Sequence, residues 1–266
     1  MIRDITIGQF FPGKSVIHRL DPRVKILLVI AFIIILFIVS SILSLFLILG
    51  LILVAYKISK ISYKLIFKNL KSMWVIILLT SVINIFFTEG QVVWSFGKLL
   101  ITKEGLIFSL VLIIRIINMI MISSLLTYTT SPIELTQALE RLLKPLKIFK
   151  IPVEDLSMMM TISLRFIPTL IDETDKIMLA QKSRGAKIDV GNIFQKLKSF
   201  IPVIIPLFVS AFRSADELAI AMECRLYGSC EKKTSIKQLK IKNIDILITC
   251  FIIIYFIIII LINNYF

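Results

Sequence analysis

The sequence predicts an all-α integral membrane protein with about five transmembrane helices and long amphipathic cytoplasmic helices inserted before the last span. Three observations predict this fold class. The 266 residues are 58% hydrophobic and only 18% charged, whereas an average soluble domain is about half apolar and about a quarter charged. The apolar residues fall in long uncharged runs, and the net charge of +14 gathers between those runs. This composition excludes an ordinary soluble enzyme, a disordered chain and a disulfide scaffold.

The first apolar run, residues 26–56, contains 31 residues without a charge. As a single helix it would be about 47 Å long, well beyond a hydrocarbon core of about 30 Å. We therefore divide it at Ser40-Ser41 into two short helices joined by a tight hairpin. Further spans are expected at residues 72–88, 106–128 and 246–261.

The distribution of lysine and arginine favours five spans. With the N-terminus in the cytoplasm, 28 of the 31 basic residues face the cytoplasm and two face outside, while Arg115 lies within a span. If residues 26–56 crossed only once, the 18 basic residues of segment 131–243 would be exported, against the positive-inside rule. The prediction is an N-terminal membrane domain (1–128) with four transmembrane helices, a cytoplasmic helical domain (129–243) and a C-terminal transmembrane helix (244–266).

Residues 8–15 match the P-loop pattern and end in Gly13-Lys14-Ser15, but their surroundings do not suit a phosphate site. A P-loop needs a buried strand before it and a free helix N-terminus after it. Here the preceding segment is short and polar, and Asp21-Pro22 is typical of the N-cap and first-turn proline of the first span. The single histidine, His18, and the odd count of three cysteines argue against a histidine-based metal site and a disulfide framework.

The segment between the fourth and fifth spans is too polar to cross a membrane and has the periodicity of helices. Ser131-Pro132-Ile133-Glu134 is a capping box with proline at the first helical position, and its helix should end near Lys144-Pro145. Two longer helices are expected at about 153–186 and 200–227, each kinked by internal proline. Such amphipathic helices lie against a membrane or other helices.

The two longer helices resemble each other at an offset of 41 residues, which aligns Arg184 with Arg225. No acidic residue stands three or four positions before or after either arginine, so neither has a carboxylate partner on its own helix. Two interpretations remain open. Each arginine is either a cation favoured by the helix dipole or a group that docks on a partner protein.

Several segments distributed over nearly the whole chain carry a family resemblance. They are Phe11-Pro12-Gly13-Lys14-Ser15, Leu20-Asp21-Pro22-Arg23, Thr129-Thr130-Ser131-Pro132, Leu164-Arg165-Phe166-Ile167-Pro168, Lys182-Ser183-Arg184-Gly185, Phe212-Arg213 and Glu223-Cys224-Arg225-Leu226. In this order they resemble the T component, the transmembrane coupling subunit, of energy-coupling factor (ECF) transporters. These transporters are vitamin and metal-ion importers of the ABC class.

In that family each of two coupling helices ends in an Ala-Arg-Gly-like triplet that inserts into a groove on an ATPase subunit. By position, the resemblance implies that Ser183, Arg184 and Gly185, and likewise Cys224, Arg225 and Leu226, bind the ATPases. The sequence departs from the triplet at Ser183, Cys224 and Leu226.

The resemblance also implies the partners of the chain. These are two ABC ATPase subunits, a separate substrate-binding S component and the lipid bilayer of a prokaryotic cell membrane. It implies no nucleic acid, no cofactor, no metal and no catalytic residue in this chain.

An ion-coupled secondary membrane carrier is the alternative function, and an integral-membrane enzyme is a further one. Carriers place ionisable groups near the bilayer midplane, but none of the 17 acidic residues lies inside the five spans. Arg115 is interpreted as a structural arginine that reaches a carbonyl or snorkels. The cluster Asp172, Glu173 and Asp175 is interpreted as a solvated face or an interhelix bridge rather than a catalytic site.

Overall fold

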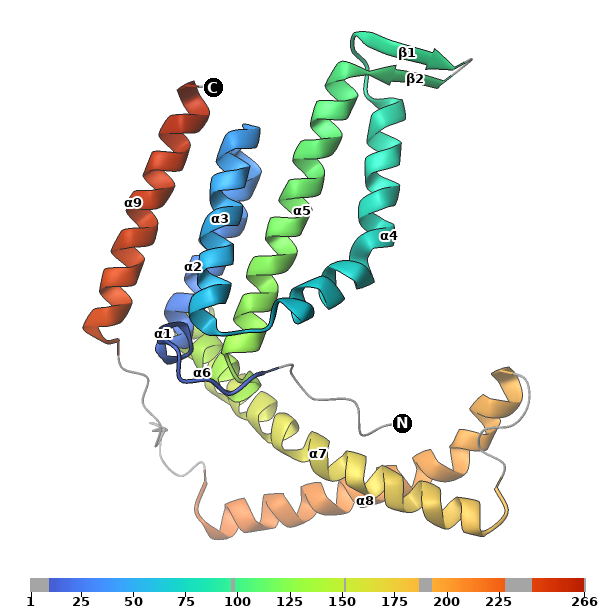
Figure 1. The fold of residues 1–266 in the computed structure, drawn as a ribbon. Coiled ribbons are helices and arrows are strands. Elements are labelled where there is room, and N and C mark those ends of the chain that lie inside the picture. The colour runs from blue at the N-terminus through green and yellow to red at the C-terminus, as the bar shows by residue number, and fades with distance from the viewer. Residues whose placement is uncertain (1–9, 97–98, 151, 187–192, 228–240, 266) are drawn as a thin grey trace. The chain divides into compact units, whose positions relative to one another are not determined.

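The computed structural model describes residues 10–265 except 97–98, 151, 187–192 and 228–240 (Figure 1). The chain divides into two compact units. The first, called the membrane unit below, comprises Gly8–Leu142 and Leu239–Phe266. The second, called the crossed-helix unit, contains Leu143–Gln238.

The membrane unit is helical apart from one short hairpin. Its elements are α1 (Val16–Arg19), α2 (Pro22–Ile38), α3 (Ile42–Ser59), α4 (Tyr63–Phe87), β1 (Val92–Phe96), β2 (Leu99–Thr102), α5 (Lys103–Thr129), α6 (Pro132–Leu143) and α9 (Asn243–Tyr265). The crossed-helix unit contains the 3-10 helix η2 (Lys144–Phe149), α7 (Val153–Ser183) and α8 (Ile193–Cys224). Four helices of the described residues, α3, α4, α5 and α9, are long and apolar enough to cross a membrane.

The first apolar run is divided as the sequence predicts, because α2 ends at Ile38 and α3 begins at Ile42. With 17 residues, α2 is shorter than the roughly 20 residues of a typical spanning helix. The turn between them is held by two side chains from other helices. Arg115 on α5 donates to the Val39 carbonyl oxygen (2.7 Å), and Asn263 on α9 accepts from the backbone N–H groups of Ser40 and Ser41 (3.1 and 3.0 Å).

These bonds confirm the interpretation of Arg115 as a structural arginine that reaches a carbonyl. Backbone groups at a break between helices have lost their helical partners and need others from the protein. Arg115 and Asn263 supply those partners from helices that are distant in sequence.

The helix expected at residues 72–88 is longer than predicted, because α4 already begins at Tyr63. The prediction treated the basic segment with Lys64, Lys68 and Lys71 as a loop. In the structure these lysines lie on the exposed side of the first turns of α4, whereas Ile66 is buried between them. The spacing of these residues therefore follows an amphipathic helix rather than a loop.

The segment between α4 and α5 contains an antiparallel hairpin that the all-α prediction did not include. β1 pairs with β2 in a register that places Val92 opposite Thr102 and Phe96 opposite Leu99. The run Val92-Val93-Trp94 is rich in β-branched and aromatic residues, which favour strands.

The core of the membrane unit lies where α2, α3, α5 and α9 meet. Its fully buried large side chains include Leu36, Leu45, Ile48, Ile52, Tyr56, Tyr128 and Ile259. The Tyr56 hydroxyl donates to the Met121 carbonyl oxygen (2.9 Å), so this buried polar group is satisfied within the core.

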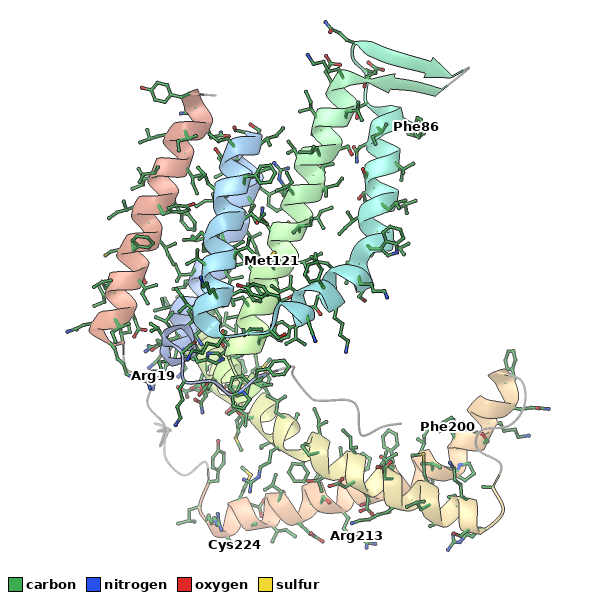
Figure 2. The ribbon with its side chains drawn as sticks, viewed as in Figure 1. Arg19, Phe86, Met121, Phe200, Arg213 and Cys224 are labelled. Atoms are coloured by element: carbon green, nitrogen blue, oxygen red, sulfur yellow. The ribbon has the colours of Figure 1, made fainter. Side chains whose placement is uncertain are left out.

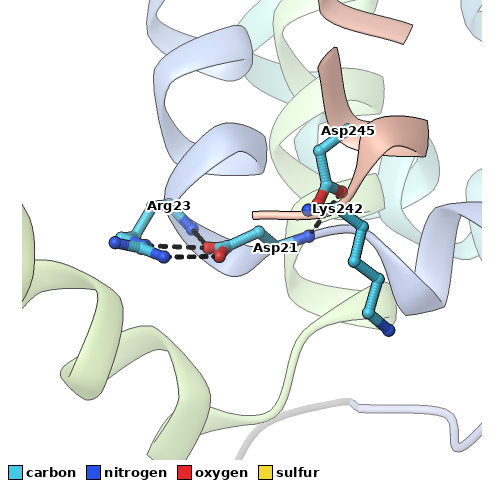
Figure 3. Close-up of polar contacts among 4 residues, drawn as sticks. All are labelled: Asp21, Arg23, Lys242 and Asp245. Atoms are coloured by element: carbon cyan, nitrogen blue, oxygen red, sulfur yellow. Dashed lines mark hydrogen bonds and ion pairs between the residues drawn. The ribbon is translucent and has the colours of Figure 1, made fainter. Parts of the chain in front are cut away.

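The N-terminal segment is tied to α5 and α9 by buried charged residues. Asp21 is the N-cap of α2, as predicted, and its own backbone N–H donates to Asp245 on α9 (3.0 Å; Figure 3). Burial raises the pKa of the Asp21 carboxyl, but hydrogen bonds and charge from Arg23 outweigh burial and leave the pKa below its usual value. Lys25, only 6% exposed, donates to the Thr129 carbonyl oxygen at the end of α5 (2.9 Å).

The pattern that resembled a P-loop surrounds His18 rather than a phosphate site. Ser15 is the N-cap of α1, and its side chain accepts a hydrogen bond from the His18 backbone N–H. The His18 ring lies within hydrogen-bonding distance of the Ser15 hydroxyl (2.7 Å) and the Phe11 carbonyl oxygen (3.0 Å). A Cβ added to Gly13 would stand 2.6 Å from this ring, so glycine is needed there for close approach to histidine.

In the crossed-helix unit, α7 and α8 run antiparallel and cross each other (Figure 1). Where they meet, a common groove is lined by Ile162, Phe166, Ile167 and Leu170 of α7 and by Ala211, Ala215, Leu218, Ala219 and Met222 of α8. The predicted helix at 200–227 begins earlier than expected, at Ile193, and α8 changes direction near Phe200 (Figure 2). Pro202 and Pro206 lie in α8 just after that position.

Candidate functional site

The C-terminal end of α7 is a complete Schellman motif. The Gly185 N–H donates to the Lys182 carbonyl oxygen (3.0 Å) and the Ala186 N–H donates to the Gln181 carbonyl oxygen (3.0 Å). Gly185 has a φ of 85°, the left-handed conformation that this motif requires and that glycine adopts without strain. Arg184 is the residue just before this glycine, at the C-cap.

The C-terminal end of α8 makes the same two bonds. The Leu226 N–H donates to the Glu223 carbonyl oxygen (2.8 Å) and the Tyr227 N–H donates to the Met222 carbonyl oxygen (3.0 Å). Leu226 takes the position of the glycine with a φ of 53°. Arg225 therefore occupies the same position in its motif as Arg184 does in the other.

Every residue of the second motif lies 41 positions after its counterpart in the first, which is the offset found in the sequence. The two helix ends, called the α7 tip (Ser183–Gly185) and the α8 tip (Cys224–Leu226) below, are thus repeats in backbone structure. A leucine in the left-handed region costs about 1–2 kcal/mol relative to a right-handed conformation. The α8 tip keeps the motif despite this cost.

All six residues of the two tips are exposed. Among the described residues, neither the Arg184 nor the Arg225 guanidinium has a hydrogen-bonding or ion-pair partner. A C-terminal helix end carries partial negative charge, so a cation there is stabilised even before a partner binds. Each tip therefore presents five unused N–H donors, which suit carboxylates and carbonyl groups on another protein.

The structure brings the three residues of each tip together but keeps the two tips apart. Because α7 and α8 are antiparallel, their C-terminal ends lie at opposite ends of the crossed pair (Figure 1). Figure 2 labels Cys224 at the α8 tip. Two separated, equivalent contact points suit two separate binding grooves better than one.

A second feature of α8 is an exposed apolar stripe, consisting of Ile201, Ile205, Phe208 and Phe212. Their spacing of four, three and four residues places them on one face of the helix. The rings of Phe208 and Phe212 stack with centroids 6.3 Å apart. The stripe is therefore a continuous apolar face of α8 that no other described residue covers.

The described residues contain no group of three or more His, Cys, Asp or Glu side chains that could hold a metal ion. In the acidic cluster of α7, Glu173 pairs with Lys176 at 3.8 Å along the helix. This pair agrees with the interpretation of the cluster as a charged helix face.

The sequence does not predict two contacts between distant segments, one in each unit. The Tyr227 hydroxyl donates to the Met158 sulfur and so joins the end of α8 to the start of α7. Asp245 accepts from Asp21, a residue 224 positions away. No local pattern marks either pair, because each depends on segments that meet only in the fold.

The family model and the relatives that match this chain indicate the same family. Residues 13–236 match the model of CbiQ, described as cobalt transport protein. A relative from Ruminiclostridium cellulolyticum, named energy-coupling factor transporter transmembrane protein EcfT, is 50% identical over 249 residues, which cover 94% of this chain and 93% of the relative. Proteins of the same name from Clostridium kluyveri and Staphylococcus aureus are 49% and 46% identical, and each alignment covers at least 90% of both chains.

These alignments cover at least nine tenths of the chain, which contains four helices long and apolar enough for a multi-pass membrane protein. The chain therefore belongs to the CbiQ family and, within it, to the transmembrane T components of energy-coupling factor transporters.

Proposed function

We propose that this chain transmits the ATP-driven motion of two ATPase subunits to a separate substrate-binding S component, which takes up a vitamin or metal ion. The observation that carries the proposal is the pair of equivalent tips, each with an exposed arginine at the same position of a Schellman motif. Two equivalent contacts match a dimer of ATPase subunits. Closure of that dimer on ATP would draw the tips together and move α7 and α8.

The proposal assigns each part of the chain a place. The N-terminal membrane domain is 1–128, the cytoplasmic coupling domain is 129–243, and the last span is 244–266. With α2 as a fifth span, the N-terminus and both tips lie in the cytoplasm, in agreement with the positive-inside rule.

The apolar stripe of α8 serves as the contact for the S component in this proposal. Ile201, Ile205, Phe208 and Phe212 present a continuous apolar face, and the S component is itself an apolar membrane protein. Burial of such a face contributes about 25 cal/mol per Å² of apolar area. This chain then binds no transported substrate, whose choice belongs to the S component.

Co-purification of the tagged chain in mild detergent, followed by mass spectrometry, tests the proposal. We expect two ATPase chains and one small apolar protein. Arg184→Ala with Arg225→Ala should release the ATPases and abolish uptake, whereas Arg213→Ala, an exposed arginine of α8 away from the tips, should not. A lone protein that shows ion-coupled uptake would instead favour the secondary carrier.

The stripe is tested separately. Phe208→Ser with Phe212→Ser should release the S component and retain both ATPases, because the tips are unchanged. Ile220→Ser, an exposed apolar residue of α8 outside the stripe, is the matched control. Retention of the S component by the double variant would show that it docks elsewhere.

A further inference from the structure

The membrane unit contains an apolar cavity of about 300 Å³ between α3 and α9, at the lower limit of the size of small-molecule sites. Its wall is formed by α2 and α5, and α1 lies across one end. Lining residues include Leu20, Phe32, Ile52, Ala55, Leu125 and Phe251. The cavity lies in the membrane unit alone and shares no residue with either tip or with the stripe.

The cavity opens between two helices that are long enough to cross the membrane. Val54 on α3 is 53% exposed and Phe251 on α9 is 59% exposed, and both line it. The opening therefore faces the side of the bundle where lipid lies.

The interior offers a ligand no polar partner. Lys25 and Thr129 are the polar residues in its lining, and both are engaged elsewhere. The Lys25 ammonium donates to the Thr129 carbonyl oxygen and the Thr130 hydroxyl, and the Thr129 hydroxyl donates to the Leu125 carbonyl oxygen. Because a buried polar ligand group would lose its hydrogen bonds here, the space suits hydrocarbon.

Two exposed cations are next in sequence to residues that line the cavity near α1. Arg19 on α1 is adjacent in sequence to the lining residue Leu20, and Lys57 on α3 is adjacent to the lining residue Ile58 (Arg19 is labelled in Figure 2). Glu134 of α6, which is half-buried, interacts electrostatically with the lining residue Lys25. Residues 10–25, 53–62 and 241–252 contain two further acidic residues, Asp21 and Asp245.

Both of these carboxylates are buried and already bonded, Asp21 to Arg23 and Asp245 to the backbone N–H groups of Asp21 and Lys242. None of the three carboxylates is exposed, whereas Arg19 and Lys57 are, so the exposed charge among these residues is positive. It is complementary to an anionic group placed at the membrane surface.

We propose that this cavity binds an anionic phospholipid, with one acyl chain between α3 and α9 and the phosphate at Arg19 and Lys57. The acyl chain fills a space that would otherwise leave apolar side chains without contacts. The headgroup meets the two cations at the level where α1 ends the membrane core. Such a lipid contacts α1, α3 and α9 at once.

Native mass spectrometry of the full chain, delipidated in detergent and titrated with phosphatidylglycerol or phosphatidylcholine, tests the headgroup. Arg19→Gln with Lys57→Gln should weaken phosphatidylglycerol binding by about 30-fold, since each cation near a membrane surface contributes about 1 kcal/mol. The double variant should bind phosphatidylcholine as the wild type does. Lys68→Gln with Lys71→Gln, two exposed lysines of α4, is the matched control because α4 does not line the cavity.

Ala55→Phe tests the acyl-chain position, because Ala55 lines the cavity and a phenyl ring would occupy it. It should weaken binding of both lipids, whereas Leu53→Phe on the same helix, outside the lining, should not. An unchanged thermal midpoint shows that the variants are folded.

The proposal is overturned if both lipids bind with equal affinity, or if neither the charge variant nor Ala55→Phe changes binding. It is also overturned if Ala55→Phe releases the S component in lipid-free detergent and leaves lipid binding unchanged. That result would assign the cavity to a protein partner.

Discussion

The α7 tip and the α8 tip share one backbone motif but reach it from different sequences. At the α7 tip the left-handed position is Gly185, and an added Cβ there would meet nothing within 4 Å. At the α8 tip the same position is Leu226, which adopts a φ of 53°. The residue that follows the α8 tip, Tyr227, also donates a hydrogen bond to Met158 near the start of α7. The residue at the same position after the α7 tip is Ala186, whose methyl side chain has no donor.

The comparison shows which features the two tips share and which differ between them. Both tips retain the arginine, the small residue before it and the two hydrogen bonds of the motif. The glycine is not retained. The same backbone geometry therefore precedes and follows both arginines, although leucine disfavours it at the α8 tip. This agrees with our proposal that the orientation of the arginine matters for ATPase binding.

Removal of both tip arginines is expected to cause the largest loss of ATPase affinity. Arginines at the centre of an interface commonly contribute 2 kcal/mol or more, or about 30-fold in affinity each. The tips are far apart, so the two losses should add to about 1,000-fold. Microscale thermophoresis of the purified ATPases with Arg184→Ala and Arg225→Ala measures this loss, and affinity within threefold of wild type would contradict the account.

The single variants test whether the tips are equivalent. Arg184→Ala alone and Arg225→Ala alone should each lower ATPase affinity by about 30-fold, and by the same factor within about threefold. The same titration measures both. A full loss in one variant with no change in the other would show that only one tip engages an ATPase.

Substitutions at the two left-handed positions should change the stability of the tips by an intermediate amount. The sign of the change should be opposite at the two tips. Gly185→Leu introduces a strain of about 1–2 kcal/mol, and Leu226→Gly removes one of similar size. The measurement is hydrogen exchange of the amides that close the motifs. We expect faster amide exchange at Ala186 in Gly185→Leu and slower amide exchange at Tyr227 in Leu226→Gly than in the wild type. Rates identical to those of the wild type would show that the left-handed leucine is not strained.

The contact of Tyr227 with Met158 should have the smallest effect. Methionine sulfur is a weak acceptor, so Tyr227→Phe should destabilise the tip by at most about 1 kcal/mol. The same hydrogen-exchange experiment detects it at the Tyr227 amide, where Phe retains the ring and the backbone. Met158→Leu should change the exchange rate of the Tyr227 amide by the same factor. A tenfold difference in that rate between the two variants would show that they do not act through this bond.

A feature of the fold or of the tips can be predicted from the sequence when its cause lies in the same segment of the chain. The break at Ser40-Ser41 follows from the length of an uncharged run, and the end of α7 follows from Gly185. The start of α4 was predicted too late because lysines at helical spacing were taken for a loop. The hairpin at β1 and β2 does not follow from the charge pattern of its segment, because strand preference there depends on the β-branched and aromatic residues.

Other features have causes that lie outside their own segment. The left-handed conformation of Leu226 has no support in the local preference of leucine, and only the 41-residue repeat indicates it. The bond of Lys25 to the Thr129 carbonyl oxygen joins residues 104 positions apart. The bond of Arg115 to Val39 likewise depends on how α5 packs against the first hairpin.

The central claim is that both tips contact ATPase subunits, and the tips offer a direct chemical probe of it. Cys224 is an exposed free thiol in the α8 tip, and Ser183→Cys creates the matching probe in the α7 tip. With Cys230 replaced by serine, Cys250 on α9 is an internal control in the membrane unit. Maleimide labelling is then measured with and without the ATPases.

The account predicts that the ATPases slow labelling at both Cys224 and Ser183→Cys by at least tenfold and leave Cys250 unchanged. Alanine at Arg184 and Arg225 should restore rapid labelling at both tips. Unchanged labelling of both tips in the intact complex would contradict the account.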